Sequence, residues 1–372
     1  MRIGEYKKVG VWLKKFIRII LLVIVVLLVF YLTGERVMEN ETLEAPVKHG
    51  SAIPAKTKGI GSAIPQTSRP EEGISVYVGK KASKVKKKFG EPNRIEPSHY
   101  EYDWWVYDDE VQLYIGVNDQ GIVNQVYTLD PEIRMSPFEL GQDLEDIYRF
   151  SIISAEIDVV LEDNVYTFSL NSEDTQTRPL IVYQDLFAQL YIDEIEGKLE
   201  GVRFIDPTTL VLHQPYEMTY MGELLMSQPP SSTLQLEVNE TTERQLYELV
   251  NALRVNHELP PLKRHYALEE LSRKHSEALA LEKINQDEAL KVEQLLQRLK
   301  LANIEHKKAG ENIAFNYADA IEAIHGWMNS PDHRQVLLNE QFTHIGTGVY
   351  GNYFTQVFIQ TDESDSPQTI QQ

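Results

Sequence analysis

The chain has 372 residues, of which 42% are hydrophobic and 25% charged, so it is long enough for two or three globular domains. It contains no cysteine, which excludes disulfides, a thiol nucleophile and cysteine-ligated zinc. Its net charge is −20, and because residues 1–18 carry +5, the remainder stands at −25. A body this acidic lacks the basic face that nucleic-acid binding needs, so we predict no nucleic-acid partner.

A basic tail at residues 1–15 precedes an apolar run. Phe16–Leu32 is seventeen residues interrupted only by Arg18, which reaches the lower limit for a membrane span if Arg18 extends to the interface. Basic residues before the run and acidic residues after it place the amino terminus in the cytoplasm. We therefore predict a transmembrane helix at 16–33: a single-pass protein of the cell membrane with its body outside the cytoplasm. A cleaved signal peptide is the alternative, but no A-x-A-like site follows the run.

Residues 34–73 are predicted to be a linker, because they contain four prolines and little apolar periodicity. Fully extended, forty such residues would reach about 130 Å, which would hold the folded part away from the membrane.

Residues 74–223 are predicted to form a domain with an internal repeat. The tetrapeptide Gln-Leu-Tyr-Ile occurs at 112–115 and again at 189–192. Each copy follows a short helical segment and lies among alternating, aromatic-rich segments typical of antiparallel strands. The predicted helices are 80–89 and 142–150, and the predicted strands are 100–107, 111–117, 122–127, 165–170, 180–183 and 199–205.

A second linker is predicted at 224–240, around Pro229-Pro230, and a mainly helical domain follows at 241–361. Leu246, Leu249, Val250 and Leu253 form a helical stripe, for which Thr241 or Thr242 would be the cap. Further helices are predicted at 267–282, 288–301 and 318–329, and a closing hairpin at 344–350 and 353–360. The polar residues 362–372 are predicted to be a disordered tail.

The densest group of polar residues lies between Ala309 and Asn339. Glu311 is expected in a Gly-Glu-Asn turn, and Ser330 is expected to cap a helix that begins at Pro331. His333 would then point along the inward face of that helix. A Ser330–His333 dyad is disfavoured, because a capping serine spends its oxygen on backbone amides. His275 also occupies an apolar stripe, which favours a core histidine.

No pattern typical of a strong metal site is present. There is no HExxH pair, so a divalent ion could be offered only Glu311 and His333, and two ligands bind weakly.

Several ordered motifs in residues 243–360 resemble the bacterial branch of the CAP superfamily (cysteine-rich secretory proteins, antigen 5 and pathogenesis-related proteins; also called SCP-like). The motifs are Ala309-Gly-Glu-Asn-Ile-Ala314, Trp327-Met-Asn-Ser-Pro-Asp-His-Arg334, Leu337-Leu-Asn339, Ile345-Gly-Thr-Gly348 and Tyr353-Phe-Thr-Gln-Val-Phe358. Residues 74–223 are similar to the CAP-associated domain of membrane-anchored Gram-positive proteins. The resemblance implies an α+β protein whose C-terminal domain is an α-β-α sandwich outside the cell.

The resemblance also implies a central cleft lined by Glu311 and His333, where relatives place two His and two Glu able to hold a divalent ion. Two of those four positions are changed here: 283–289 contains no histidine, and Tyr353 replaces the histidine of the His-Tyr-Thr-Gln motif. We therefore expect Glu311 and His333 to remain as a hydrogen-bonded pair that raises the pKa of His333. The candidate binding cleft comprises Glu311, His333, Asn312, Ser330, Gln356 and His275.

Three functions follow as hypotheses. The first is a non-catalytic binding module at the cell envelope, with no cofactor, no catalytic residue, and an envelope component, lipid or protein as ligand. The alternative is a divalent-metal-dependent hydrolase with Glu311 as base and His333 as ligand or electrostatic stabiliser. A structural envelope spacer is the third hypothesis.

Overall fold

The computed structural model describes residues 16, 18, 20, 21, 36–46, 50–52, 67–109, 111–284 and 294–361. Most of the predicted anchor at 16–33 and the whole tail at 362–372 lie outside these residues. Within the described part of the chain, no helix has the length and apolar character needed to span a membrane.

The predicted repeat domain is built on a seven-stranded antiparallel sheet, in the order β10-β11-β12-β7-β6-β5-β4. The two copies of the repeated tetrapeptide place Tyr114 on β6 and Tyr191 on β11 of this one sheet. The strands are β4 (Arg94–Pro97), β5 (Tyr102–Tyr107), β6 (Leu113–Asn118), β7 (Val123–Thr128), β10 (Leu180–Val182), β11 (Phe187–Asp193) and β12 (Lys198–Ile205).

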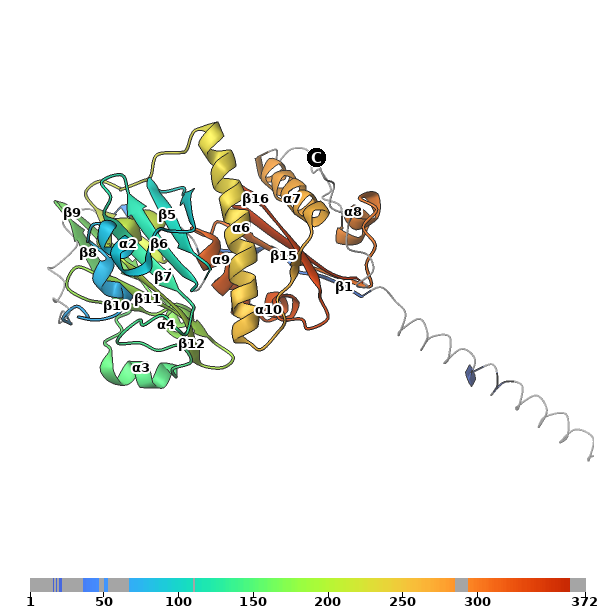
Figure 1. The fold of residues 1–372 in the computed structure, drawn as a ribbon, viewed down its shortest axis with the longest axis horizontal. Helices are drawn as coiled ribbons and strands as arrows, with labels where there is room; N and C mark the ends of the chain where they lie inside the picture. The colour runs from blue at the N-terminus through green and yellow to red at the C-terminus, as the bar shows by residue number, and fades with distance from the viewer. Residues whose placement is uncertain are drawn as a thin grey trace, which may run out of the picture.

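Short helices cover one face of this sheet, and a smaller sheet packs beside it (Figure 1). The covering elements are η1 (Ile74–Tyr77), α2 (Ser83–Phe89) and α3 (Leu144–Phe150). The smaller sheet has the order β3-β13-β9-β8, and two helices accompany it. These elements are β3 (Ser51–Ala52), β8 (Glu156–Leu161), β9 (Asn164–Ser169), α4 (Ser172–Thr177), α5 (Pro207–His213) and β13 (Glu217–Met221).

The C-terminal domain is a sheet of order β1-β15-β17-β16-β14 with helices on both faces, the α-β-α sandwich that the resemblance implied (Figure 1). Its strands are β1 (Arg36–Glu39), β14 (Lys263–Arg264), β15 (Lys308–Phe315), β16 (His344–Tyr350) and β17 (Tyr353–Gln360). Helices α6 (Ser232–Asn256), α9 (Ala320–Met328) and α10 (Pro331–Leu337) pack on one face. Helices α7 (Tyr266–Ile284) and α8 (Leu295–Leu301) pack on the other.

Two glycines let α7 lie directly on β16. A Cβ added at Gly346 would lie 2.3 Å from the backbone of Leu268, and one at Gly348 would lie 2.0 Å from the backbone of Arg273. Ser272 of α7 donates its hydroxyl to the Gly346 carbonyl at 3.0 Å. The Gly-Thr-Gly motif therefore sets the spacing between helix and sheet.

Helix α6 begins earlier than predicted. Its cap is Ser231, whose Oγ accepts the backbone N–H of Leu234 at 3.3 Å, and neither Thr241 nor Thr242 caps it. The predicted linker at 224–240 is therefore helical from Ser232 onward. The first turns of α6 are mostly polar, so they carry no apolar stripe that would reveal a helix.

Part of the predicted linker at 34–73 also belongs to the sheets. β1 (Arg36–Glu39) and β2 (Leu43–Glu44) both pair in parallel with β15, while β3 pairs with β13 of the repeat domain. We call residues 36–45 the strap. The paired residues of this linker do not form a free spacer, because they pair as strands with the two folded domains.

The two domains share one hydrophobic core. Trp104, Tyr114 and Tyr127 of the seven-stranded sheet belong to the same buried cluster as Leu249 of α6 and Trp327 of α9. Helix α6 stands between the two large sheets (Figure 1).

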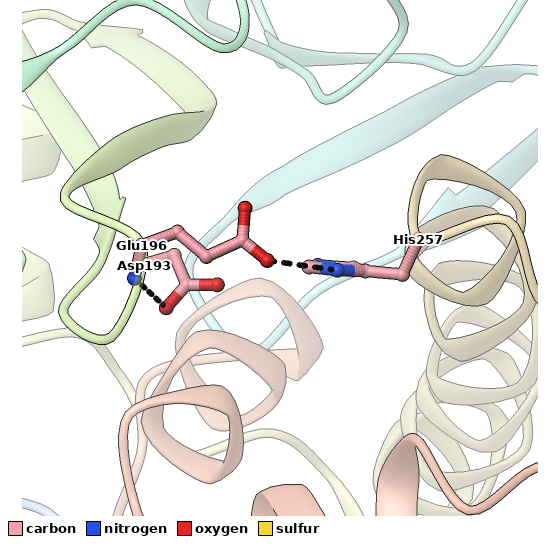
Figure 2. A group of neighbouring side chains, drawn as sticks. All are labelled: Asp193, Glu196 and His257. Carbon is pink, nitrogen blue, oxygen red and sulfur yellow. Dashed lines mark hydrogen bonds and ion pairs between the residues drawn. The ribbon is translucent and has the colours of Figure 1, made fainter.

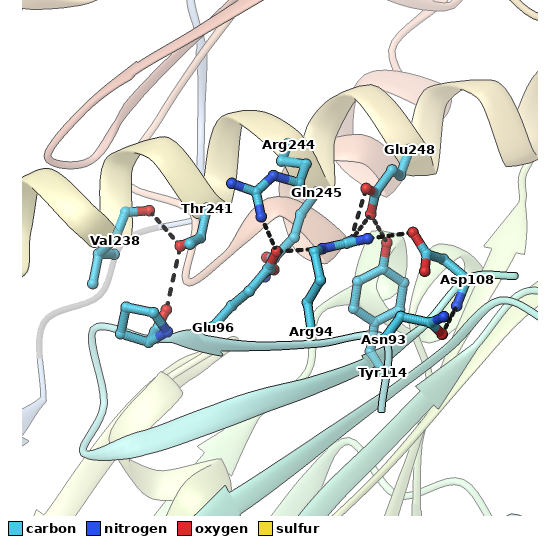
Figure 3. A network of polar contacts seen from close by, with 11 residues as sticks. Asn93, Arg94, Glu96, Asp108, Tyr114, Val238, Thr241, Arg244, Gln245 and Glu248 are labelled. Carbon is cyan, nitrogen blue, oxygen red and sulfur yellow. Dashed lines mark hydrogen bonds and ion pairs between the residues drawn. The ribbon is translucent and has the colours of Figure 1, made fainter. Parts of the chain in front are cut away.

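A polar network lies along the same contact between α6 and the seven-stranded sheet (Figure 3). Arg94 of β4 contacts both Glu248 oxygens, at 2.8 and 2.7 Å, and Glu96 accepts from Arg244 and Gln245 at 2.8 Å each. Burial raises the pKa of Glu248 to about 7, although the neighbouring Arg94 opposes this shift. The linker at 224–240 therefore does not separate two independent bodies.

Candidate functional site

Glu311 lies in a strand, and the prediction of a turn is wrong. β15 runs from Lys308 to Phe315 and pairs with β17 on one side and with the strap on the other. Gly310 and Asn312 favour turns in isolation, but two flanking strands satisfy the backbone of this segment, so tertiary pairing overrides the local preference.

Arg298 of α8 is the ionic partner of Glu311. Its guanidinium donates to Glu311 Oε2 at 2.6 Å, and the Glu311 side chain is only 4% exposed. Burial raises the pKa of Glu311, an effect that Arg298 opposes and Glu39 of the strap reinforces. The buried carboxylate therefore has its own protein cation.

His275 of α7 lies beside the same carboxylate. Its Nε2 lies 3.8 Å from Glu311 Oε2, and burial, assisted by the nearby Arg298, lowers the pKa of His275 to about 3. Among the described residues, neither His275 Nδ1 nor Glu311 Oε1 has a hydrogen-bond partner. Glu311 Oε1 and His275 Nδ1 are therefore buried polar atoms that could each form one more hydrogen bond.

Asn312 faces the opposite side of the sheet, because successive residues of a strand alternate between faces. It donates from Nδ2 to the backbone carbonyl of His333 in α10 at 3.0 Å. Gln356 is the register partner of Asn312 on β17 and is fully buried, and no described residue hydrogen-bonds its amide group.

His333 is buried at the start of α10, with both ring nitrogens engaged. Nδ1 lies 2.8 Å from Ser330 Oγ, and Nε2 lies 2.9 Å from the backbone carbonyl oxygen of Glu41 in the strap. A carbonyl only accepts, so Nε2 carries the proton and Ser330 donates to Nδ1. Burial lowers the pKa of His333, although the Glu41 carbonyl and Asp332 oppose this.

Ser330 does not cap α10 through its side chain. The hydroxyl bonds His333 in place of a backbone amide, so the expectation that capping would keep the two residues apart is wrong.

The six candidate residues form two groups and not one cleft. His275 and Glu311 lie on the α7–α8 face with Arg298. The other four, Asn312, Gln356, Ser330 and His333, lie on the α10 face. The expected Glu311–His333 hydrogen bond is absent from these described residues, because each side chain has other partners. The expected rise in the pKa of His333 is therefore wrong in direction, and the two residues do not form a two-ligand metal site.

Two contributors to the site had no signal in the sequence. Arg298 is one basic residue on an amphipathic helix, and nothing in its spacing points to Glu311. The strap lies some 270 positions from its contacts, as Asn40 and Asn312 show with a separation of 272 residues. The contacts of Arg298 and of the strap can be identified only from the tertiary structure, where α8 and the strap lie against β15.

A second group of acidic and histidine side chains lies at the domain interface (Figure 2). Asp193 is the last residue of β11, Glu196 lies in the turn between β11 and β12, and His257 follows the last residue of α6. One ligand atom from each lies within 4.8 Å of the others, a spacing that a divalent ion could use.

Protein groups already balance the charge of this second group. Arg334 of α10 lies 2.6 Å from an Asp193 oxygen and 3.8 Å from Glu196. His257 Nε2 lies 2.6 Å from Glu200, which raises the pKa of His257. We therefore interpret this group as an ion-pair cluster that joins the domains.

Comparisons with known proteins agree with the two-domain description. A family model described as CAP-associated N-terminal matches residues 78–216, and one described as cysteine-rich secretory protein family matches residues 247–361. A membrane protein of Bacillus subtilis, YlbC, is 37% identical over 294 residues, covering 78% of this chain and 84% of that protein.

Two solved structures share the fold. An extracellular SCP-domain protein from Bacillus anthracis is 31% identical with a TM-score of 0.72, covering 83% of this chain and all of that one (100%). A cysteine-rich secretory protein from Staphylococcus aureus has the same TM-score of 0.72 at 24% identity, over 87% of this chain and 100% of that one.

Proposed function

This chain belongs to the cysteine-rich secretory protein (CAP) family, with a CAP-associated domain before its CAP domain, and from this premise we propose that it is a non-catalytic binding module of the cell envelope. The observation that carries the proposal is the ion pair between Arg298 and Glu311, at 2.6 Å. A guanidinium already neutralises the one carboxylate that a metal-dependent hydrolase would need as its base. The separation of Glu311 and His333 onto opposite faces supports the same conclusion.

Metal content tests this proposal against the hydrolase alternative. We expect the purified protein to contain no stoichiometric divalent ion and to bind none well below millimolar when zinc or calcium is titrated. The Glu311→Gln chain is the matched control, because it removes the candidate ligand and keeps the side-chain shape. An ion present in the wild type and lost from Glu311→Gln would overturn the proposal and support the hydrolase.

We further propose that Phe16–Leu32 anchors the protein in the membrane with both domains outside. The strap begins at Arg36, three positions after the predicted end of the anchor at residue 33. A chain anchored in this way holds its CAP domain at the membrane surface, and not at the end of an extended 40-residue spacer.

Protease accessibility tests this topology. Protease added to intact cells stripped of their wall should digest both domains and leave an amino-terminal fragment in the membrane. The same digestion after cell lysis, with a cytoplasmic marker protein followed in parallel, is the control for cell integrity. A mature protein that begins near Gly34 and is found free in the medium would contradict the anchor.

A further inference from the structure

β15 is buried like an interior strand although it would lie at an edge of the CAP sheet without the strap. Seven of its eight residues are buried, and no charged residue or proline lies between Glu311 and Phe315 to discourage pairing. The opposite edge is protected in the usual way: β14 is two residues long, Lys263 and Arg264, and both are exposed. An edge strand that is this buried and has so little protection against pairing requires a partner strand.

The strap supplies that partner in parallel register. Arg36 to Glu39 pair with Lys308 to Glu311, and after a short interruption Leu43 and Glu44 pair with Ala314 and Phe315. Its side chains alternate between the two faces of the CAP sheet. Met38 and Leu43 pack against the core shared with the repeat domain, whereas Val37 packs against the α7–α8 core.

The interruption between β1 and β2 brings the strap onto the α10 face of the candidate site. Asn40 donates from Nδ2 to Asn312 Oδ1 at 3.0 Å, and the Glu41 carbonyl accepts from His333 Nε2 at 2.9 Å. Ala45 closes the contact by donating its backbone N–H to the Phe315 carbonyl at 2.9 Å. The strap therefore covers Asn312 and His333 and determines the protonated nitrogen of His333.

We propose that the β15 edge, with Asn312 and His333, is a binding site for an extended peptide that runs parallel to β15, and that residues 36–45 occupy this site in cis. The inference rests on the proposed binding function and names its ligand class. Main-chain pairing supplies sequence-tolerant affinity, and the pockets for alternate side chains supply the preference. The peptide that fits has apolar residues at the positions of Met38 and Leu43 and a hydrogen-bonding side chain at that of Asn40.

Because the strap occupies the site in cis, a peptide in solution must displace it in order to bind. The strap is tethered to its own acceptor, so it competes with any peptide in solution at an effective concentration in the millimolar range. A weakened strap should therefore open the site without altering β15, Asn312 or His333.

Opening the strap in the full chain is the first test. Met38→Asp with Leu43→Asp places two charges where the strap meets the core. A fluorescent peptide with the sequence of residues 36–46 should bind this open chain about tenfold or more tightly than the wild type, in detergent solution. The same peptide carrying both Asp substitutions is the matched control and should not bind. Equal binding of the native peptide by open and wild-type chains with the same near-UV circular dichroism would overturn the proposal.

A disulfide lock tests the same site with the strap held in place. The chain has no cysteine, so Val37→Cys with Ala309→Cys introduces a single pair at register partners. Neighbouring strands lie about 4.8 Å apart, within the range of Cα separations that a disulfide spans. Added to the open chain, this pair should abolish peptide binding when oxidised, and reduction should restore the binding of the open chain. Unchanged binding on oxidation, with the cross-link verified by mass, would overturn the proposal.

Failure of this inference and failure of the proposed function give different results. Metal content is measured on the same samples, so an ion that the wild type binds and the Glu311→Gln chain does not bind contradicts the non-catalytic proposal whatever the peptide does. A metal-free chain whose open form binds no peptide contradicts only the strand-acceptor site.

Discussion

Arg203→Met should destabilise the protein by about 3–5 kcal/mol, because it leaves a buried carboxylate without its cation. Arg203 of β12 is fully buried and contacts both oxygens of Asp319 in the CAP domain at 2.8 Å. Burial acts to raise the pKa of Asp319, but attraction to Arg203 and His213, together with the hydrogen bonds from Arg203 and the Glu322 amide, outweighs it and lowers that pKa. The pair thus joins the domains inside their shared core, and urea unfolding followed by fluorescence and circular dichroism measures its loss.

Two further variants distinguish this buried pair from an exposed ion pair. Arg149→Met removes an exposed Arg149–Asp146 contact and should cost less than about 1 kcal/mol. Asp319→Asn keeps the side-chain oxygen that caps α9, by accepting from Glu322 N–H, and removes the charge. Adding it to Arg203→Met should therefore cost much less than the sum of the two single losses. A loss for Arg203→Met as small as that for Arg149→Met would show that the pair does not hold the domains together.

Arg298→Met should produce the second large effect, and that effect should depend on pH. Without Arg298, burial acts on Glu311 unopposed, so its pKa should rise further above the unfolded reference of about 4.3. A carboxyl whose folded pKa is raised loses stability as pH rises from the unfolded value to the folded one. The loss should therefore be small near pH 5, where Glu311 takes a proton, and approach about 3–5 kcal/mol at pH 8.

Urea unfolding at pH 5, 6.5 and 8 measures this dependence. Lys300→Met is the matched control, since it removes one positive charge from an exposed position of the same helix α8. Arg298→Met combined with Glu311→Gln should abolish the pH dependence, because no buried carboxyl remains to titrate. If Arg298→Met alone lost the same free energy of unfolding at pH 5 and at pH 8, Arg298 would not stabilise the ionised form of Glu311.

Local sequence patterns predicted most of the regular elements. The stripe around Leu249 identified α6, the alternation in 344–350 and 353–360 identified the β16–β17 hairpin, and the repeated tetrapeptide identified two strands of one sheet. Such patterns can be recognised in a sequence because side chains return to the same face of a helix or strand every few residues. The family motifs added the sandwich architecture, and the structure and the comparisons agree with it.

Only the tertiary structure decided which polar residues meet. Asn312 and Glu311 are adjacent in sequence, yet the pleat of β15 directs them to opposite faces, toward α10 and α8. The partners that matter, Arg298 for Glu311 and the strap for His333, are chosen by packing between distant segments. Periodicity reports which face of an element is apolar, but it carries no information on what that face will touch. For that reason the sequence determined the elements and the family, while assembly of the sheet edge and the domain interface decided the site.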